Sequence, residues 1–183
     1  MRCSRCGDEF YARRDARFCS TRCRVAAHRA GDGPPSELTT RDRWVNHRNK
    51  APLRVGGGSF ASTTNPATWG TYAQARAVTH TDGVGFVLNG DGVACVDLDK
   101  CVRPDGSLEP WAEAIIARCP RTYVEVSQSG RGLHIFGFAE VGKGRRRDGV
   151  EVYDRGRFIV ITGRRFRDFP RRLADIAGVV ATV

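Results

Sequence analysis

Two aspartates follow an apolar stretch near the middle of the chain. Residues 92–100 read GVACVDLDK, a pattern typical of a buried β-strand that ends in acids. Because successive side chains alternate between the faces of a strand, Asp97 and Asp99 would share one face, and Val96 and Leu98 the other. Carboxylates spaced in this way lie about 7 Å apart, and they are ligands that Mg²⁺ and Mn²⁺ prefer. The pair indicates a divalent-metal site, although so short a motif also occurs where a strand runs out into a polar turn.

A glycine-rich polar turn with a histidine beyond it offers a second kind of chemistry. Residues 127–137 read SQSGRGLHIFG, in which Ser127, Ser129 and Arg131 supply hydrogen-bond donors beside backbone N–H groups. Such a set of donors suits a triphosphate. A single histidine on a strand is most often structural, but the glycines around the turn favour a functional role for His134.

A third acid and several cations lie on other segments. Glu151, within the GVEVYD of residues 149–154, alternates with valines as Asp97 does on its own strand. Lys50 precedes a glycine-rich turn at residues 56–59, which could face phosphate but does not match a Walker A motif. The basic loop 142–149 is solvated by default and would grip nucleic-acid phosphates in an enzyme that acts on DNA.

Four cysteines near the amino terminus form two close pairs, Cys3 with Cys6 and Cys19 with Cys23. In a reducing compartment this spacing predicts a tetrahedral structural Zn²⁺ site of the treble-clef or zinc-ribbon type. A redox pair or an iron–sulfur cluster is the alternative. About thirty residues bury too little surface to fold alone, so the metal would supply the folding energy. The module is basic, which suits nucleic acid, but it could equally dock a protein or cap the domain.

Secondary-structure signals place these residues on a series of strands. We expect a zinc finger over 1–31, a linker over 32–39, and a main domain over 40–183. Apolar runs and turn residues predict a β-hairpin from the strands 83–88 and 93–98, further strands at 122–127, 133–137, 150–153 and 157–163, a helix from an N-cap at Thr68 to about Val78, a helix capped by Ser107 and ending near Arg118, and a short helix over 170–177.

Composition narrows the classes of partner. The chain of 183 residues has 30 lysines and arginines against 20 acids, a formal net charge of +10, and nearly all of its basic residues are arginines. This balance fits a polyanionic partner, although an arginine-rich chain can also reflect a GC-rich genome. The start of the chain has no apolar signal segment, and no apolar run approaches the roughly 18 residues of a membrane span. We therefore expect a cytoplasmic protein with no membrane partner.

Taken together, the three motifs resemble those of a known family. Residues 96–99 (VDLD), 127–134 (SQSGRGLH) and 150–154 (VEVYD) resemble the acidic pair, the Ser-x-His-like turn and the third acid of the prim-pol domain of the archaeo-eukaryotic primase superfamily, found in phage and plasmid replication proteins. The phrases KAP at 50–52, NPATW at 65–69 and RFIVITG at 157–163 also look like that family. The resemblance covers roughly residues 40–165.

This resemblance implies a fold and a role for each candidate site residue. The fold would be α+β, an RRM-like antiparallel sheet with helices on one side, next to a small α/β unit that forms the other wall of a cleft. Two Mg²⁺ or Mn²⁺ ions would be held by Asp97, Asp99 and Glu151. The phosphates of the incoming nucleotide would be bound by His134 with the turn residues Ser127, Ser129 and Arg131, while Lys50 and Arg157 are further candidates for phosphate or template contacts.

The function implied is template-directed nucleotidyl transfer, as a DNA primase, a DNA polymerase or both. Its partners would be a single-stranded DNA template, nucleoside triphosphates and a replicative helicase, in the replication of phage, plasmid or mobile-element DNA. A metal-dependent nuclease is an alternative, because acids and a histidine also assemble hydrolytic sites. A non-catalytic zinc-finger protein that binds nucleic acid is a second alternative.

Overall fold

The structure is a computed structural model that describes residues 3, 8–12, 16, 18–23 and 33–183. It divides into two compact units, Met1–Gly33 and Pro34–Val183. In the first unit, residues 21–23 are helical, and Cys6 and residues 24–32 lie outside the described part. The second unit carries all the strands named below. Along the described residues no helix has the length and apolar character needed to cross a lipid bilayer.

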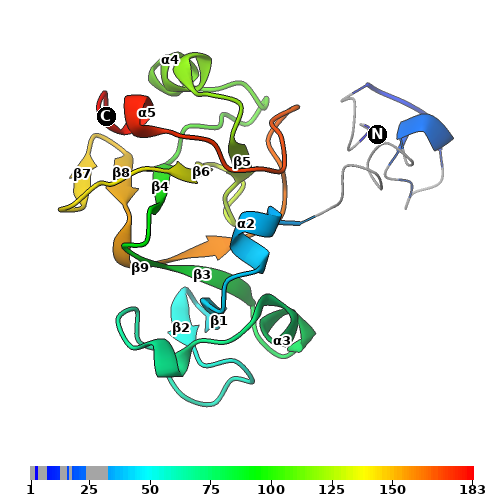
Figure 1. The fold of residues 1–183 in the computed structure, drawn as a ribbon. Helices are drawn as coiled ribbons and strands as arrows, with labels where there is room; N and C mark the ends of the chain where they lie inside the picture. The colour runs from blue at the N-terminus through cyan, green and yellow to red at the C-terminus, as the bar shows by residue number, and fades with distance from the viewer. Residues whose placement is uncertain (1–2, 4–7, 13–15, 17, 24–32) are drawn as a thin grey trace. The chain divides into compact units, whose positions relative to one another are not determined.

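The second unit is built on two antiparallel sheets, as expected for an α+β protein. One sheet has the order β2-β1-β3-β9 and the other the order β5-β6-β4-β8-β7. Figure 1 shows the five-stranded sheet above the four-stranded one, with α4 and α5 beyond it. The strands are β1 (Trp44–Arg48), β2 (Ala51–Leu53), β3 (Gly83–Asn89), β4 (Val93–Leu98), β5 (Tyr123–Val126), β6 (Leu133–Phe138), β7 (Arg145–Arg147), β8 (Val150–Tyr153) and β9 (Arg155–Ile161), and the helices are α2 (Ser36–Thr39), the 3-10 helix η1 (Pro66–Thr68), α3 (Tyr72–Ala77), α4 (Pro110–Arg118) and α5 (Ala177–Val180).

The predicted hairpin between β3 and β4 is wrong, because the two strands belong to different sheets. β3 pairs with β1 and β9, whereas β4 pairs with β6 and β8. The turn between them is held from outside: the Gly90 N–H donates to the Asp154 carbonyl oxygen (2.7 Å), and the Asp91 carboxylate is paired with Arg43 (2.7 Å) and Arg41. The turn therefore carries the chain from one sheet to the other.

Two predicted helix starts are also corrected. Thr68 lies in η1, and α3 is capped instead by Thr71, which forms a reciprocal capping box with Gln74. α4 ends at Arg118 as predicted, but its N-cap is Glu109, and the Ser107 hydroxyl donates to the Asp105 carboxylate (2.6 Å) instead.

The predicted helix over residues 170–177 is absent, and α5 forms further along. Here the backbone groups bond to the end of β6: the Phe138 N–H donates to the Ala174 carbonyl oxygen (2.8 Å), and the Ile176 N–H to the Phe138 carbonyl oxygen (2.9 Å). Because these groups already have partners, residues 174–176 lie alongside β6 instead of forming a helix.

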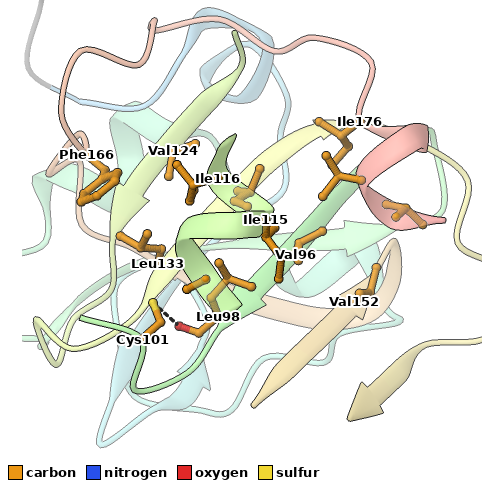
Figure 2. Close-up of a cluster of buried hydrophobic side chains, with 14 of the residues drawn as sticks. Val96, Leu98, Cys101, Ile115, Ile116, Val124, Leu133, Val152, Phe166 and Ile176 are labelled. Carbon is orange, nitrogen blue, oxygen red and sulfur yellow. Dashed lines mark hydrogen bonds between the residues drawn. The ribbon is translucent and has the colours of Figure 1, made fainter. Parts of the chain in front are cut away.

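Two apolar cores lie on the two faces of the five-stranded sheet. On the outer face, Ile115 and Ile116 of α4 pack on Val96 and Leu98 of β4, as Figure 2 shows. There the Cys101 thiol also donates to the Leu98 carbonyl oxygen (3.3 Å). The inner face packs against the four-stranded sheet through a second cluster.

The predicted linker over 32–39 includes part of this second core. Its residues 36–39 form α2, whose Leu38 is fully buried in the inner cluster. The Leu173 N–H donates to the Glu37 carboxylate (3.0 Å), and Arg171 donates to the Pro34 carbonyl oxygen (2.8 Å). Residues 34–39 therefore pack as part of the second unit.

Candidate active site

A row of charged side chains crosses the five-stranded sheet at one level. Directly opposed residues on neighbouring strands are Glu125 and His134, His134 and Asp97, Asp97 and Glu151, and Glu151 and Arg146. Directly opposed residues of an antiparallel pair have Cβ atoms about 5 Å apart on the same face. The register thus brings together Asp97, Glu151 and His134, three residues that are far apart in the sequence.

This polar row lies on the inner face of the sheet. Its neighbours along the strands, Cys95, Phe136 and Tyr123, belong to the cluster that also contains Phe86 and Ile159 of the four-stranded sheet. Along the strands, these apolar residues bury the row in one direction. In the other direction the strands end, and the row is open there.

Asp97 is the centre of the row, and its side chain keeps 24% of its surface exposed. Burial, together with the negative charges of Asp99 and Glu151, raises the pKa of Asp97, while His134 and Lys50 oppose that shift. Asp99 follows the end of β4, where its N–H donates to the Gly149 carbonyl oxygen (2.7 Å). Three carboxylates that repel one another at a partly open position are an oxygen-ligand set that a divalent cation would stabilise.

Glu151 contacts Arg146 directly and Arg157 through Tyr153. One of its carboxylate oxygens lies 2.9 Å from Nε of Arg146, and the other accepts the Tyr153 hydroxyl (3.0 Å). Arg157 stacks over the Tyr153 ring, with 4.6 Å from its Cζ to the ring centroid, and donates to the Tyr153 hydroxyl (3.1 Å). Arg157 is therefore linked to the acids through Tyr153, and it does not line the pocket described below.

Glu125 is the site residue that the sequence analysis missed. It is fully buried on β5, and its carboxylate accepts Nδ1 of His134 at 3.1 Å. The other imidazole nitrogen, Nε2, lies 3.8 Å from the Asp97 carboxylate. Burial by itself lowers the pKa of His134, but Glu125, Asp97 and Asp99 outweigh burial, so that the pKa is raised. In the sequence Glu125 looks like an ordinary polar position between two valines, and only the pairing of β5 with β6 reveals its partner.

A pocket of about 160 Å³ opens between the two sheets at this row. Its walls come from both sheets and from the turn before β6: they are formed by Lys50, Asp97, Asp99, Ser127, Gln128, Ser129, His134, Phe158, Ile159 and Val160. The pocket thus joins two of the predicted metal ligands to most of the predicted phosphate-binding residues.

The polar turn before β6 is fixed by its own serines. The Ser127 hydroxyl accepts the Gly132 N–H (3.1 Å), and the Ser129 hydroxyl accepts the Arg131 N–H (3.2 Å). Arg164 donates to the carbonyl oxygens of Ser127 and Gln128 from the outside. Ser127 and Ser129 line the pocket, whereas Arg131 is exposed on the same turn and does not.

Lys50 reaches the pocket from the turn between β1 and β2. Both turn residues, Asn49 and Lys50, have positive φ (49° and 61°), and the Asn49 N–H donates to the Asp82 carboxylate (2.7 Å). Lys50 thus supplies a positive charge from the four-stranded sheet, opposite the acids of the other sheet.

The cysteines of the first unit form a separate cluster. The sulfur atoms of Cys3, Cys19 and Cys23 all lie within 4.8 Å of one another. The predicted fourth ligand, Cys6, lies outside the described residues. Three sulfurs at this separation are a soft-ligand set that fits Zn²⁺.

Comparison with known proteins adds to these observations. The chain is similar to the DNA primase-polymerase of Nitratiruptor phage NrS-1: the two are 34% identical over 136 residues, which cover 67% of this chain and 19% of that protein. The chain thus spans about a fifth of the length of this curated relative. No protein-family model matches the chain. The resemblance to a phage-type primase-polymerase that the motifs indicated is confirmed.

Proposed function

We propose, on the premise that this chain belongs with the phage-type DNA primase-polymerases, that it transfers nucleotides onto DNA under the direction of a template. The observation that carries the proposal is the juxtaposition of Asp97 with Glu151 on one side and His134 on the other across three neighbouring strands. Asp97 and Asp99 line one pocket with His134, and Glu151 lies beside Asp97 on the next strand. Acids that can hold metal ions next to a group that can bind phosphate are what nucleotidyl transfer requires.

The acids would hold the catalytic metal ions. Asp97, Asp99 and Glu151 offer carboxylate oxygens, the ligand type of Mg²⁺ and Mn²⁺. Burial, and after it the negative charges of Asp99 and Glu151, raise the pKa of Asp97, and a bound cation would stabilise its charged form. A bound divalent cation would supply activation of an attacking 3′-hydroxyl and stabilisation of the departing pyrophosphate. Arg146 contacts Glu151 at 2.9 Å and would have to release it.

The other pocket residues would bind the phosphates of the incoming nucleotide. His134, Ser127 and Ser129 present donors from the five-stranded sheet, and Lys50 presents a positive charge from the opposite wall. Arg131 and Arg157 lie outside the pocket walls, so we propose them for the more distant parts of the nucleotide or for the template. The pocket is open on one side, where the base and sugar of the nucleotide would extend beyond the phosphate-binding residues.

The proposal extends to the fold and to the first unit. We interpret the five-stranded antiparallel sheet with helices on its outer face as the RRM-like sheet of a primase, and the four-stranded sheet as the second wall of its cleft. Cys3, Cys19 and Cys23, completed by Cys6, would hold a structural zinc ion. A single-stranded template and a replicative helicase are the partners proposed, in phage, plasmid or mobile-element replication.

The test is an extension assay with the whole chain. A 5′-labelled primer on a single-stranded template is incubated with deoxynucleotides or ribonucleotides and Mg²⁺ or Mn²⁺, and an unprimed template is incubated in parallel with labelled nucleotides. We expect nucleotide-dependent lengthening by the wild-type protein and its loss in Asp97→Ala/Asp99→Ala. Product on the unprimed template would identify a primase.

Other outcomes would contradict the proposal. Shortening of the labelled strand without nucleotides would indicate a nuclease. Binding of single-stranded DNA with no turnover under any of these conditions would indicate a nucleic-acid-binding protein.

A further inference from the structure

Glu125 is a fully buried carboxylate whose oxygens are surrounded by donors. Besides Nδ1 of His134 (3.1 Å), they accept the Tyr123 hydroxyl (2.8 Å), the Thr162 N–H (3.1 and 3.2 Å) and the Gly163 N–H (2.9 Å). These donors come from β5, from β6 and from the segment that follows β9, and the Glu125 side chain has no exposed surface.

Such a group is poorly explained by stability alone. A buried carboxylate loses its hydration, and replacement of a buried ionic contact by apolar residues is often neutral or stabilising. Positions with the same inward orientation on this face of the sheet, such as Cys95 and Phe136, carry ordinary core residues. The location of Glu125 next to His134 therefore suggests a role in the site.

The contact with Glu125 fixes which atom of His134 remains available. Nδ1 is engaged by Glu125, and the ring lies edge-on to Phe136, with 6.3 Å between centroids and 89° between planes. His134 lines the pocket, so Nε2 is the ring nitrogen left for a ligand there. Its separation from Asp97, 3.8 Å, is longer than a hydrogen bond.

Glu125 also connects the two walls of the pocket. Thr162 and Gly163 directly follow β9, the strand whose residues 158–160 line the opposite wall. The Thr162 hydroxyl donates to the Val126 carbonyl oxygen (2.7 Å), which holds the same segment against β5. One carboxylate thus sets the position of the imidazole relative to that wall.

We infer that Glu125 is a positioning residue for nucleotide binding: it holds the His134 imidazole so that Nε2 donates to a phosphate of the nucleoside triphosphate in the pocket. The inference rests on the proposed function, since it takes the nucleotide as the ligand. Glu125 itself touches no substrate and acts through His134.

A double-mutant cycle tests the inference. The affinity for a fluorescent, non-hydrolysable deoxynucleoside triphosphate is measured with Mg²⁺ for the wild type, Glu125→Gln, His134→Asn and the double variant. Removal of a residue that orients a binding group costs about tenfold in affinity. We expect about this loss for Glu125→Gln, no further loss when it is added to His134→Asn, and, in steady-state extension, a raised KM with little change in kcat.

Two further variants keep the test decisive. Tyr123→Phe removes a hydrogen bond to the same carboxylate but leaves the contact with His134, so it should bind nucleotide as the wild type does. Glu125→Asp keeps the negative charge, but its shorter side chain places the carboxylate further from Nδ1 of His134. It replaces Glu125→Gln in the cycle if circular dichroism shows that the Glu125→Gln protein is unfolded.

The outcomes separate the inference from the proposed function. If Glu125→Gln lowers the nucleotide affinity by the same factor in the presence and in the absence of His134, Glu125 has a purely structural role and the inference is wrong. The same conclusion follows if Tyr123→Phe lowers the affinity as much as Glu125→Gln does. If the wild type itself binds no nucleoside triphosphate, the proposed function fails first.

Discussion

Gly132 offers a quantitative test of how the phosphate-binding turn is built. A Cβ atom at this position would lie 2.7 Å from the Leu98 carbonyl oxygen and 3.0 Å from the Ser127 hydroxyl oxygen. The Leu98 carbonyl belongs to β4, which is paired on both sides and cannot easily retreat. The turn must move instead in Gly132→Ala.

The cost can be worked from these contacts. Overpacking of a well-packed site costs about 1–3 kcal/mol. Movement of the turn also strains two hydrogen bonds between Ser127 and Gly132, of 2.9 and 3.1 Å, each worth about 1 kcal/mol. We therefore expect Gly132→Ala to lower the free energy of unfolding by about 3 kcal/mol and to weaken nucleotide binding, because Ser127 and Ser129 line the pocket.

Urea unfolding followed by tryptophan fluorescence measures the first effect. All three tryptophans, Trp44, Trp69 and Trp111, lie in the second unit, so the signal reports on that unit. Gly178→Ala is the matched control: a Cβ at Gly178 would meet nothing within 4 Å, and alanine is favoured in a helix such as α5. A Gly132→Ala protein as stable as the wild type, with unchanged nucleotide affinity, would refute the description of this turn.

Three further changes test other parts of the site, with Cys119→Ser as a folded control outside both proposed metal sites. Asp97→Asn should lower the affinity for Mn²⁺, measured by electron paramagnetic resonance, by about tenfold or more, because a central carboxylate ligand is lost; affinity equal to that of the control would contradict the proposed metal site. Cys19→Ser should remove the zinc that elemental analysis is expected to find at about one ion per wild-type chain; a wild-type chain free of zinc would overturn this. Lys50→Met should raise the KM for nucleotide by about tenfold, as expected for a lost hydrogen bond to a charged group, whereas Arg54→Met, outside the pocket, should leave the KM near that of the wild type; equal effects would count against Lys50 as a phosphate ligand.

The candidate site was predictable where local pattern and side-chain chemistry coincide. Alternation along β4 places Asp97 on the inner face and its neighbours Val96 and Leu98 on the outer face, and the same alternation places Glu151 between two valines that face the outer core. These features follow from the two-residue period of a strand, which is readable from the sequence alone.

The pairing of strands was not predictable in the same way. The residues 89–92 have a hairpin composition, but the turn is held by Arg43 and by the Asp154 carbonyl oxygen, and β4 finds its partners 35 or more residues further along the chain. Such distant contacts leave no local signal. Glu125 escaped notice for a different reason: its partner His134 is only nine residues away on the neighbouring strand, but a glutamate between two valines looks like an ordinary polar strand position. The start of α3 was a different case, since Thr71 and Gln74 carry a capping-box spacing that sequence reasoning passed over in favour of Thr68.

The central claim is that template-directed nucleotidyl transfer takes place at the site formed by Asp97, Glu151 and His134. Single-nucleotide incorporation tests this claim most directly. One primer is annealed to four templates that differ only in the next base. Each template is incubated with Mn²⁺ and with each of the four deoxynucleotides in a separate reaction. We predict that the wild-type protein adds the complementary nucleotide to each template and that Asp97→Asn adds none. Addition that ignores the template base, or addition that survives in Asp97→Asn, would contradict the account.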